Sequence, residues 1–239
     1  MAGSASKDMT QGSPTKLIFA FFVPLMLGML FQQFYSMMDT IIVGKFLGVQ
    51  ALAAVGSTGS INFMVIGFCM GICNGFAIPV AQRFGAKDYE ELRKYVANGI
   101  FLAAVFAGIM TVGVCLLCRN ILQWMHTPSD IMDGAYRYIF VIFLGIPVIY
   151  LYNLLSGFIR SLGDSKSPLM FLIISSLLNI VLDLLLIINF DMGVSGAAWA
   201  TVISQGISGI LCICYIGKKY EVLQLSKSEW RLDKDCIKK

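Results

Sequence analysis

Charged side chains are scarce in this sequence, and residues typical of catalysis are scarcer still. Only 13% of the 239 residues are charged, whereas a soluble domain has about a quarter. There is a single histidine, His126. The sequence contains no HExxH, no GxSxG, no GxxxxGK and no GxGxxG placed after a strand. These absences argue against an enzyme, and the low charge argues against a soluble protein.

The seven cysteines do not suggest a disulfide framework. Six of them lie in or at the ends of apolar runs, and Cys236 lies near the C-terminus. Cys115 and Cys118 form a CxxC pair, but a zinc site needs two further ligands and His126 stands alone. We interpret this pair as small apolar packing residues.

Hydrophobic residues make up 57% of the chain and gather in long runs with little or no charge. Each run is long enough to cross roughly 30 Å of hydrocarbon as a helix at about 1.5 Å per residue. None shows the alternation that a membrane β-barrel requires. The sequence therefore predicts an all-α membrane protein with six transmembrane helices, within residues 17–43, 51–81, 95–118, 138–159, 168–190 and 192–217.

The basic residues fall mostly on one side of these helices. Fifteen of the 18 Lys and Arg residues flank the start of the first run, the ends of the even-numbered runs or the C-terminal tail, and the other three are Lys45, Arg119 and Arg137. By the positive-inside rule both termini are cytoplasmic. We expect a cytoplasmic segment at 1–16 without a cleavable signal peptide, a six-helix lobe at 17–217 and a cytoplasmic tail at 218–239. The net charge of +4 follows from this topology and does not call for nucleic-acid binding.

Two acidic residues lie inside the apolar runs. An Asp at mid-membrane costs about 2.5 to 3.5 kcal/mol, so a helix bundle keeps one only where it faces the interior. Asp39 continues a polar stripe that includes Gln32 and Tyr35, and Asp183 follows Ser176 and Asn179 on one helix face. In the last run Thr201, Gln205 and Ser208 form a third stripe.

The topology places Asp39, Asn179, Asp183 and Thr201 in the outer half of the membrane, so that three helices can build one site. Such polar residues can simply satisfy one another across helices, but two carboxyls at one level favour a functional site. Burial disfavours a charged carboxylate, so a proton is a plausible ligand. A small cation would find hard oxygen donors in the same place.

Proline and glycine punctuate the first two runs. Pro24 and Gly28 lie on the cytoplasmic side of Asp39, and a proline inside a helix indicates either a static kink or a hinge. Gly67, Gly71 and Gly75 recur at four-residue steps, which predicts a close contact with another helix. A faint echo links the two acids: Gly-Val follows Asp39 after nine residues and Asp183 after ten, each time at the start of an Ala-rich helix.

Five stretches carry a family resemblance: MMDTIIVGKFLG, AQRFGAKDYEELR, SGFIRSLGDSKSP, LLNIVLDLLLI and MGVSGAAWATVISQ. In this order and spacing the chain resembles the N-terminal lobe of the multidrug and toxic compound extrusion (MATE) family over nearly its whole length. The resemblance implies a V-shaped pair of six-helix lobes that exports cationic, often aromatic compounds in exchange for protons or sodium ions. It assigns Asp39, Asn179, Asp183 and Thr201 to the coupling site and Pro24 to a bending point of the first helix.

The resemblance covers six helices, whereas family members have about twelve. The end of the chain, LSKSEWRLDKDCIKK, looks like the connector between two lobes, so the chain is either a fragment or a half-size protein that pairs with a second lobe. The resemblance implies no organic cofactor, and no metal other than a sodium ion at the coupling site. The implied location is the plasma or inner membrane.

The expected mechanism is alternating access, with substrate and coupling ion competing for one pool of negative charge. Gln32, Tyr35 and Asn153 are candidate contacts for the substrate, or ordinary interhelical hydrogen bonds. A lipid-linked precursor flippase is the first alternative, although its cavity would need Arg and Lys for an anionic lipid. A six-helix channel or structural membrane subunit is the second.

Overall fold

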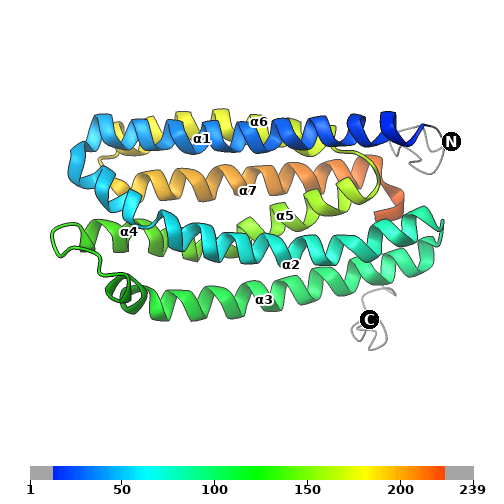
Figure 1. Cartoon of the computed structure of the whole chain (residues 1–239), viewed down its shortest axis with the longest axis horizontal. Coiled ribbons are helices and arrows are strands. Elements are labelled where there is room, and N and C mark those ends of the chain that lie inside the picture. Colours follow the sequence, from blue (N-terminus) through cyan, green and yellow to red (C-terminus); the bar gives the residue numbers. More distant parts are fainter. Residues whose placement is uncertain (1–12, 224–239) are drawn as a thin grey trace.

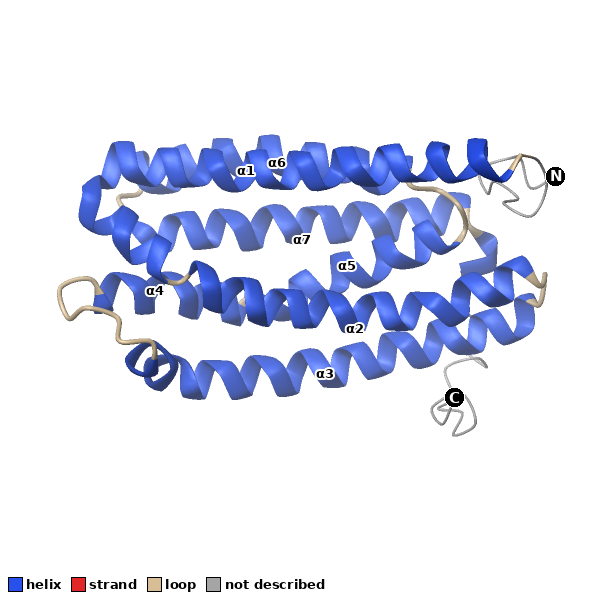
Figure 2. Ribbon diagram, in the orientation of Figure 1, coloured by secondary structure: helices blue, strands red, loops and turns tan. Residues whose placement is uncertain are grey.

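The computed structural model describes residues 13–223 as a bundle of long helices joined by short turns (Figure 1). No strand occurs in this range (Figure 2). The predicted segments 1–16 and 218–239 lie mostly outside the described residues. The elements are α1 (Pro14–Ser57), α2 (Gly59–Gly85), α3 (Tyr89–Trp124), α4 (Met132–Leu144), α5 (Ile146–Ser161), α6 (Lys166–Leu184), the π-helix η1 (Leu185–Asn189), α7 (Val194–Lys219) and the 3₁₀ turn η2 (Glu221–Leu223).

Five helices within 13–223 are long and apolar enough to cross a membrane. The short helices α4 and α5 meet at a bend of 46° and make a sixth crossing when taken as one broken span. Many large apolar side chains are exposed on the outside of the bundle, as lipid contact requires. The predicted fold class is confirmed, whereas the cytoplasmic placement of both termini stays a prediction.

The helices pack in two groups that share the centre of the bundle. Helices α1 and α6 lie side by side and contact α7, whereas α2 and α3 cover α5 from the other side (Figure 1). Helices α4, α5 and α7 supply much of the core, including Phe143, Phe158 and Ile146, which are at most 1% exposed. The polar stripes of α1, α6 and α7 lie where these three helices pack against one another.

The predicted boundaries of the first two spans are wrong at the turn between them. Helix α1 extends beyond residue 43, and its only residue with non-helical backbone angles is Gly48, at φ 85°. The chain then stays helical to Ser57 and turns at Thr58. Thr58 is fully buried, and its hydroxyl donates to the Val55 carbonyl. The turn falls in the small, uncharged stretch 56–60, which the absence of charge places inside the second predicted run.

The glycines of α2 do not make the predicted close helix contact. A Cβ atom added at Gly67, Gly71 or Gly75 would meet nothing within 4 Å in the described structure. Their spacing places them on one face of α2, but no helix of the described residues covers it at that distance. Because these glycines lack side chains, this face is smooth. The helix contacts of α2 are made by other residues, among them the buried Cys69 and Cys73.

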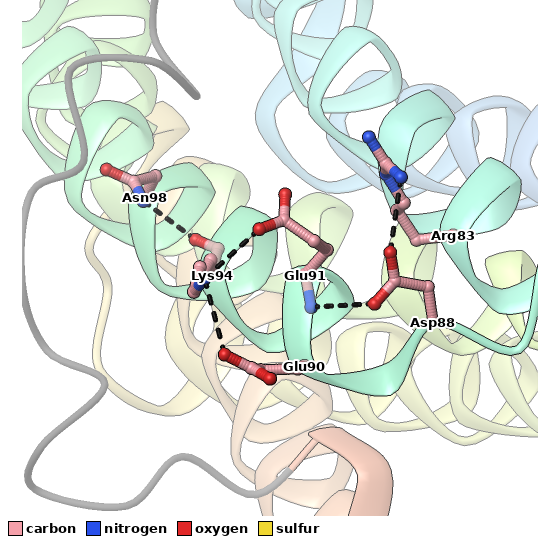
Figure 3. A network of polar contacts seen from close by, with 6 residues as sticks. All are labelled: Arg83, Asp88, Glu90, Glu91, Lys94 and Asn98. Carbon is pink, nitrogen blue, oxygen red and sulfur yellow. Dashed lines mark hydrogen bonds and ion pairs between the residues drawn. The ribbon is translucent and has the colours of Figure 1, made fainter.

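Charged residues close the turn between α2 and α3 (Figure 3), at the end of the bundle where the described residues begin and end (Figure 1). Arg83 pairs with Asp88 at 3.2 Å, and the other Asp88 oxygen accepts the Glu91 backbone N–H that begins α3. Lys94 pairs with Glu90 and Glu91 one turn further along. Because such exposed pairs each contribute only about 0 to 1 kcal/mol, their main effect is to fix the geometry of the turn.

A second polar cluster at the same end joins α6 to the end of α7. The Asp164 carboxylate accepts hydrogen bonds from the Ser167 hydroxyl at 2.6 Å, the Tyr220 hydroxyl at 2.7 Å and the Tyr215 hydroxyl at 3.2 Å. Burial alone would raise the pKa of Asp164, but the hydrogen bonds from Ser167 and Tyr220 and the charge of Lys219 outweigh it and hold the pKa below its usual value. The cluster thereby fixes the direction in which the chain leaves α7.

The predicted fourth helix, 138–159, is broken at Gly145. Gly145 ends α4, and Pro147 sits in the first turn of α5, where a proline is tolerated. A Cβ atom on Gly145 would lie 2.3 Å from Cγ2 of Val202 on α7, so only glycine allows the two helices to approach this closely. Val202 directly follows Thr201, so this contact also positions one of the predicted site residues.

We therefore expect Gly145→Ala to destabilise the chain by about 1 to 3 kcal/mol, the usual effect of overpacking a core. Val202→Ala removes both clashing methyl groups, so the double variant should recover much of the loss. Thermal unfolding of the purified chain in detergent measures both effects. Gly113→Ala on α3 is the matched control, because its added Cβ meets nothing within 4 Å. Equal melting temperatures for Gly145→Ala and Gly113→Ala would contradict the contact.

Candidate functional site

The structure brings the four predicted coupling residues together between α1, α6 and α7. Asp183 and Asn179 on α6 are 0% exposed, and Asp39 on α1 is 7% exposed. The Asn179 amide donates to the Thr201 hydroxyl at 3.5 Å. Asp39 and Asp183 lie close enough to interact electrostatically. Their helical spacing explains the gathering, because Asn179 and Asp183 are one turn apart on the face of α6 that meets α7.

Tyrosines from two helices complete this group, which we call the carboxyl cluster: Tyr35, Asp39, Tyr138, Asn179, Asp183 and Thr201. The Tyr35 hydroxyl donates to the Thr201 hydroxyl at 3.0 Å. Thr201 in turn donates to the carbonyl of Ala197 on its own helix at 3.1 Å. Tyr138 on α4 is 6% exposed and interacts electrostatically with Asp39 and Asp183.

Tyr138 was missed by the sequence argument. It is the first residue of the fourth apolar run, next to Arg137, and belongs to none of the polar stripes. The packing of α4 against α1 and α7 brings it to the acids, and helical spacing within one segment cannot reveal such a contact.

The cluster has more oxygen atoms than hydrogen-bond donors. Within the described residues, neither oxygen of Asp183, nor Oδ1 of Asp39, nor Oδ1 of Asn179 has a hydrogen-bond partner, although all four atoms are buried. A buried ionised carboxylate without a partner costs several kcal/mol. These oxygens fit either a proton, which removes the charge, or a hard cation such as sodium, which oxygen ligands prefer.

The remaining candidate residues lie outside this cluster. Gln32 is exposed on α1, and the Asn153 amide donates to the Ile149 carbonyl of its own helix at 2.8 Å. Only Tyr35 of the three proposed substrate contacts is bonded to the cluster. Pro24 lies inside α1, whose backbone angles stay helical there. Its role as a hinge stays a prediction, as do the roles of the cluster residues.

No group of three or more His, Cys, Asp or Glu side chains that could hold a metal ion occurs within residues 13–223. The carboxyl cluster has only two carboxyls, so any cation bound there would also need the oxygens of Asn179 and Thr201. Among the described residues, Asp39 and Asp183 are the charged side chains that are buried. The charged side chains that are fully buried in this range are thus both acids.

Comparison with known proteins identifies the family. The family model described as MatE matches residues 24–185, which include α2 to α6, most of α1, and both acids. The chain belongs to the MATE family. The resemblance seen in the sequence is confirmed, and the chain is a member of a family of transporters, not of enzymes.

The relatives are multidrug resistance and export proteins. The chain is 34% identical over 212 residues to the probable multidrug resistance protein YpnP of Bacillus subtilis, covering 88% of this chain and 47% of that protein. It is 28% identical over 222 residues to the multidrug export protein MepA of Staphylococcus saprophyticus, covering 91% of this chain and 48% of that protein. The chain therefore spans about half the length of these MATE relatives.

Solved structures agree with this partial coverage. A MOP superfamily transporter from Pyrococcus furiosus, described as having a binding pocket of reverse polarity, superposes with a TM-score of 0.90 at 25% identity and covers 100% of this chain and 53% of that one. A MATE structure in the bent conformation gives a TM-score of 0.88 at 28% identity, covering 98% of this chain and 53% of that one. The bundle of this chain is thus a little over half of a MATE fold.

Proposed function

We propose that this chain is the N-terminal six-helix lobe of a secondary active antiporter that exports cationic or amphipathic drug-like compounds in exchange for protons or sodium ions. The single observation that carries the proposal is the buried acid pair Asp39 and Asp183, with three oxygens that lack hydrogen-bond partners. A charged pair in this state is stable only when it binds a positive ion. The names of the MATE relatives support the export of drugs, and the buried acids support the coupling to an ion.

The proposed mechanism is alternating access through competition. With the acids ionised, a cationic substrate is drawn into the cavity between this lobe and a second one. Binding of a proton or sodium ion to the carboxyl cluster removes one of its two negative charges, weakens the attraction and favours the state that releases the substrate on the outside. Because both ligands depend on the same negative charge, each lowers the affinity for the other by the same factor. We place the transporter in the plasma or inner membrane, with both chain termini in the cytoplasm.

The sign of the buried charge favours this function over a lipid flippase. A flippase for an anionic lipid needs buried cations, whereas the buried charged residues of 13–223 are both acids. Arg160, at the end of α5, is partly exposed, and its charge interacts with the buried Tyr152, Cys73 and Cys212. The acidic sign therefore holds for the fully buried charges alone. The reverse polarity of the pocket in the relative from Pyrococcus furiosus illustrates that the fold alone does not fix the substrate.

The function is tested in lipid vesicles that contain both this chain and the second six-helix lobe of the transporter. A fluorescent organic cation should leave the compartment when a proton or sodium gradient of the opposite direction is imposed, and collapse of the gradient by an ionophore should stop the export. An ion current without exchange of the organic cation would indicate a channel. Movement of a labelled lipid in place of the cation would indicate a flippase.

The conformational change is expected to involve Pro24 of α1. Proline lacks the N–H that would bond to the preceding turn, so the helix bends there at low cost. We expect Pro24→Ala to lower the turnover of export several-fold with little change in substrate affinity, because a straightened helix favours one of two states. Turnover and half-saturation are measured in the same vesicles. Unchanged turnover would leave Pro24 as a residue of a static helix.

A further inference from the structure

A pocket opens at the end of the bundle that lies away from the chain termini. It has a volume of about 430 Å³ and is lined by residues of α1, of α4 and of the segment that begins α7. Leu47 precedes the break at Gly48, Asp133 and Arg137 lie one turn apart on α4, and Gly193 and Ser195 stand at the start of α7. Neither the family nor the mechanism above assigns a role to it.

Backbone geometry explains why a pocket forms there. Gly48 and Gly193 both have positive φ angles, 85° and 58°, so α1 breaks and α7 begins at this level without side chains that would fill the gap. The start of α4 is held close to α1, because a Cβ on Gly134 would lie 3.0 Å from Cβ of Ala54. The backbone path at both glycines therefore contributes to the pocket.

The three helices that line the pocket also carry residues of the carboxyl cluster. On α1, Leu47 lies eight residues beyond Asp39, or roughly 12 Å at the helical rise. On α7, Ser195 lies six residues before Thr201, or roughly 9 Å. On α4, Arg137 of the pocket directly precedes Tyr138 of the cluster. The pocket is thus about two helical turns from the carboxyl cluster along α1 and α7.

A thin apolar layer separates the pocket from the acids. Val43 is midway between Leu47 and Asp39 on the same face of α1, and Ala197 is one turn from Thr201 on α7. Both are 0% exposed. A single Val and a small Ala leave little to displace, so a modest shift of α1 against α7 would join the pocket to the acid pair.

We infer that this pocket is the vestibule through which the coupling cation, a proton or a sodium ion, enters the carboxyl cluster from the side of the membrane opposite the chain termini. The inference rests on the proposed antiport. Asp133 attracts cations to the vestibule and Arg137 repels them, so the balance of these two charges sets the local concentration of the ion.

The electrostatic test uses two variants with opposite expected signs. In vesicles with the complete transporter, the concentration of coupling ion that gives half-maximal export should rise about two- to fivefold in Asp133→Asn and fall by a similar factor in Arg137→Gln. At about 0.1 M of an inert salt the Debye length is roughly 10 Å, and at about 1 M roughly 3 Å, so both effects should shrink at high salt. Arg119→Gln is the control, because exposed Arg119 on α3 does not line the pocket.

The steric test uses Ser195→Cys and a bulky thiol reagent that does not cross membranes. The reagent should react from the side opposite the termini, and the labelled protein should export several-fold more slowly until a reductant removes the label. The chain without the added cysteine, treated in the same way, accounts for the native cysteines. Mass spectrometry of the labelled peptide confirms the site of modification.

Each result decides between the claims. Three outcomes would contradict the proposed vestibule. The first is a shift of the same sign in Asp133→Asn and Arg137→Gln, and the second is a shift in Arg119→Gln as large as theirs. The third is unchanged export by fully labelled Ser195→Cys. A Ser195→Cys that the reagent does not reach from that side would contradict the vestibule as well. Export of the unmodified protein that does not respond to any ion would instead overturn the proposed antiport, which is a separate outcome.

Discussion

Replacing Asp183 by Asn is expected to reduce gradient-driven export to the level seen without a gradient, while the protein still folds and inserts. Asn keeps the shape of Asp and removes the ionisable charge. Since both Asp183 oxygens are buried without hydrogen-bond partners, no native hydrogen bond of the carboxylate is lost. The buried charge is also relieved, so the melting temperature should stay equal or rise.

The measurement compares export of the same fluorescent cation with and without the imposed gradient. Asp133→Asn is a suitable partner variant, because it removes a carboxylate from the exposed vestibule and should shift the ion dependence without abolishing coupling. A folded Asp183→Asn protein that exports at the original rate in response to the gradient would show that Asp183 does not bind the coupling ion. If Asp183→Asn does not fold, the same measurement is made on Asp39→Asn, which removes the other carboxyl of the pair.

The sequence predicted the helices, because transfer of apolar runs into lipid depends on composition and length, which are local properties. It also predicted that four of the six residues of the carboxyl cluster meet, since an Asp inside an apolar helix must face other polar groups. Asp39, Asn179, Asp183 and Thr201 are accordingly found together. The polar stripes predicted this contact correctly because burying an unpaired charge costs more free energy than the differences between alternative helix packings.

The break at Gly145 and the contact of Tyr138 could not be predicted in the same way. The bend depends on Val202, which lies 57 residues away in the chain and leaves space only for a glycine. The pocket likewise depends on how α1, α4 and the start of α7 pack against one another, which the repeated Gly-Val after each acid does not reveal. These features arise from contacts between helices, whereas sequence periodicity reports only the faces within one helix.

Membranes that contain this chain alone are expected to show no gradient-driven export of organic cations. An alternating-access cavity needs two walls, and the chain spans about half the length of its relatives. The described helices bury both acids inside one bundle, with Asp183 at 0% and Asp39 at 7% exposure, so the lobe is able to fold with its carboxyl cluster complete. We therefore expect a stable lobe that binds the coupling ion and does not transport.

Reconstitution of the purified 239-residue chain separates these properties. Binding is followed by the rise in melting temperature with increasing sodium or proton concentration, because a ligand that binds only the folded state stabilises it by mass action. Asp183→Asn in the same assay should lose that rise. Export is then measured for the chain alone, for a cross-linked dimer of the chain, and for the chain with a second six-helix lobe. Export by a verified monomer would overturn the requirement for a second wall, whereas export only by the cross-linked dimer would show that two copies of this lobe form the cavity.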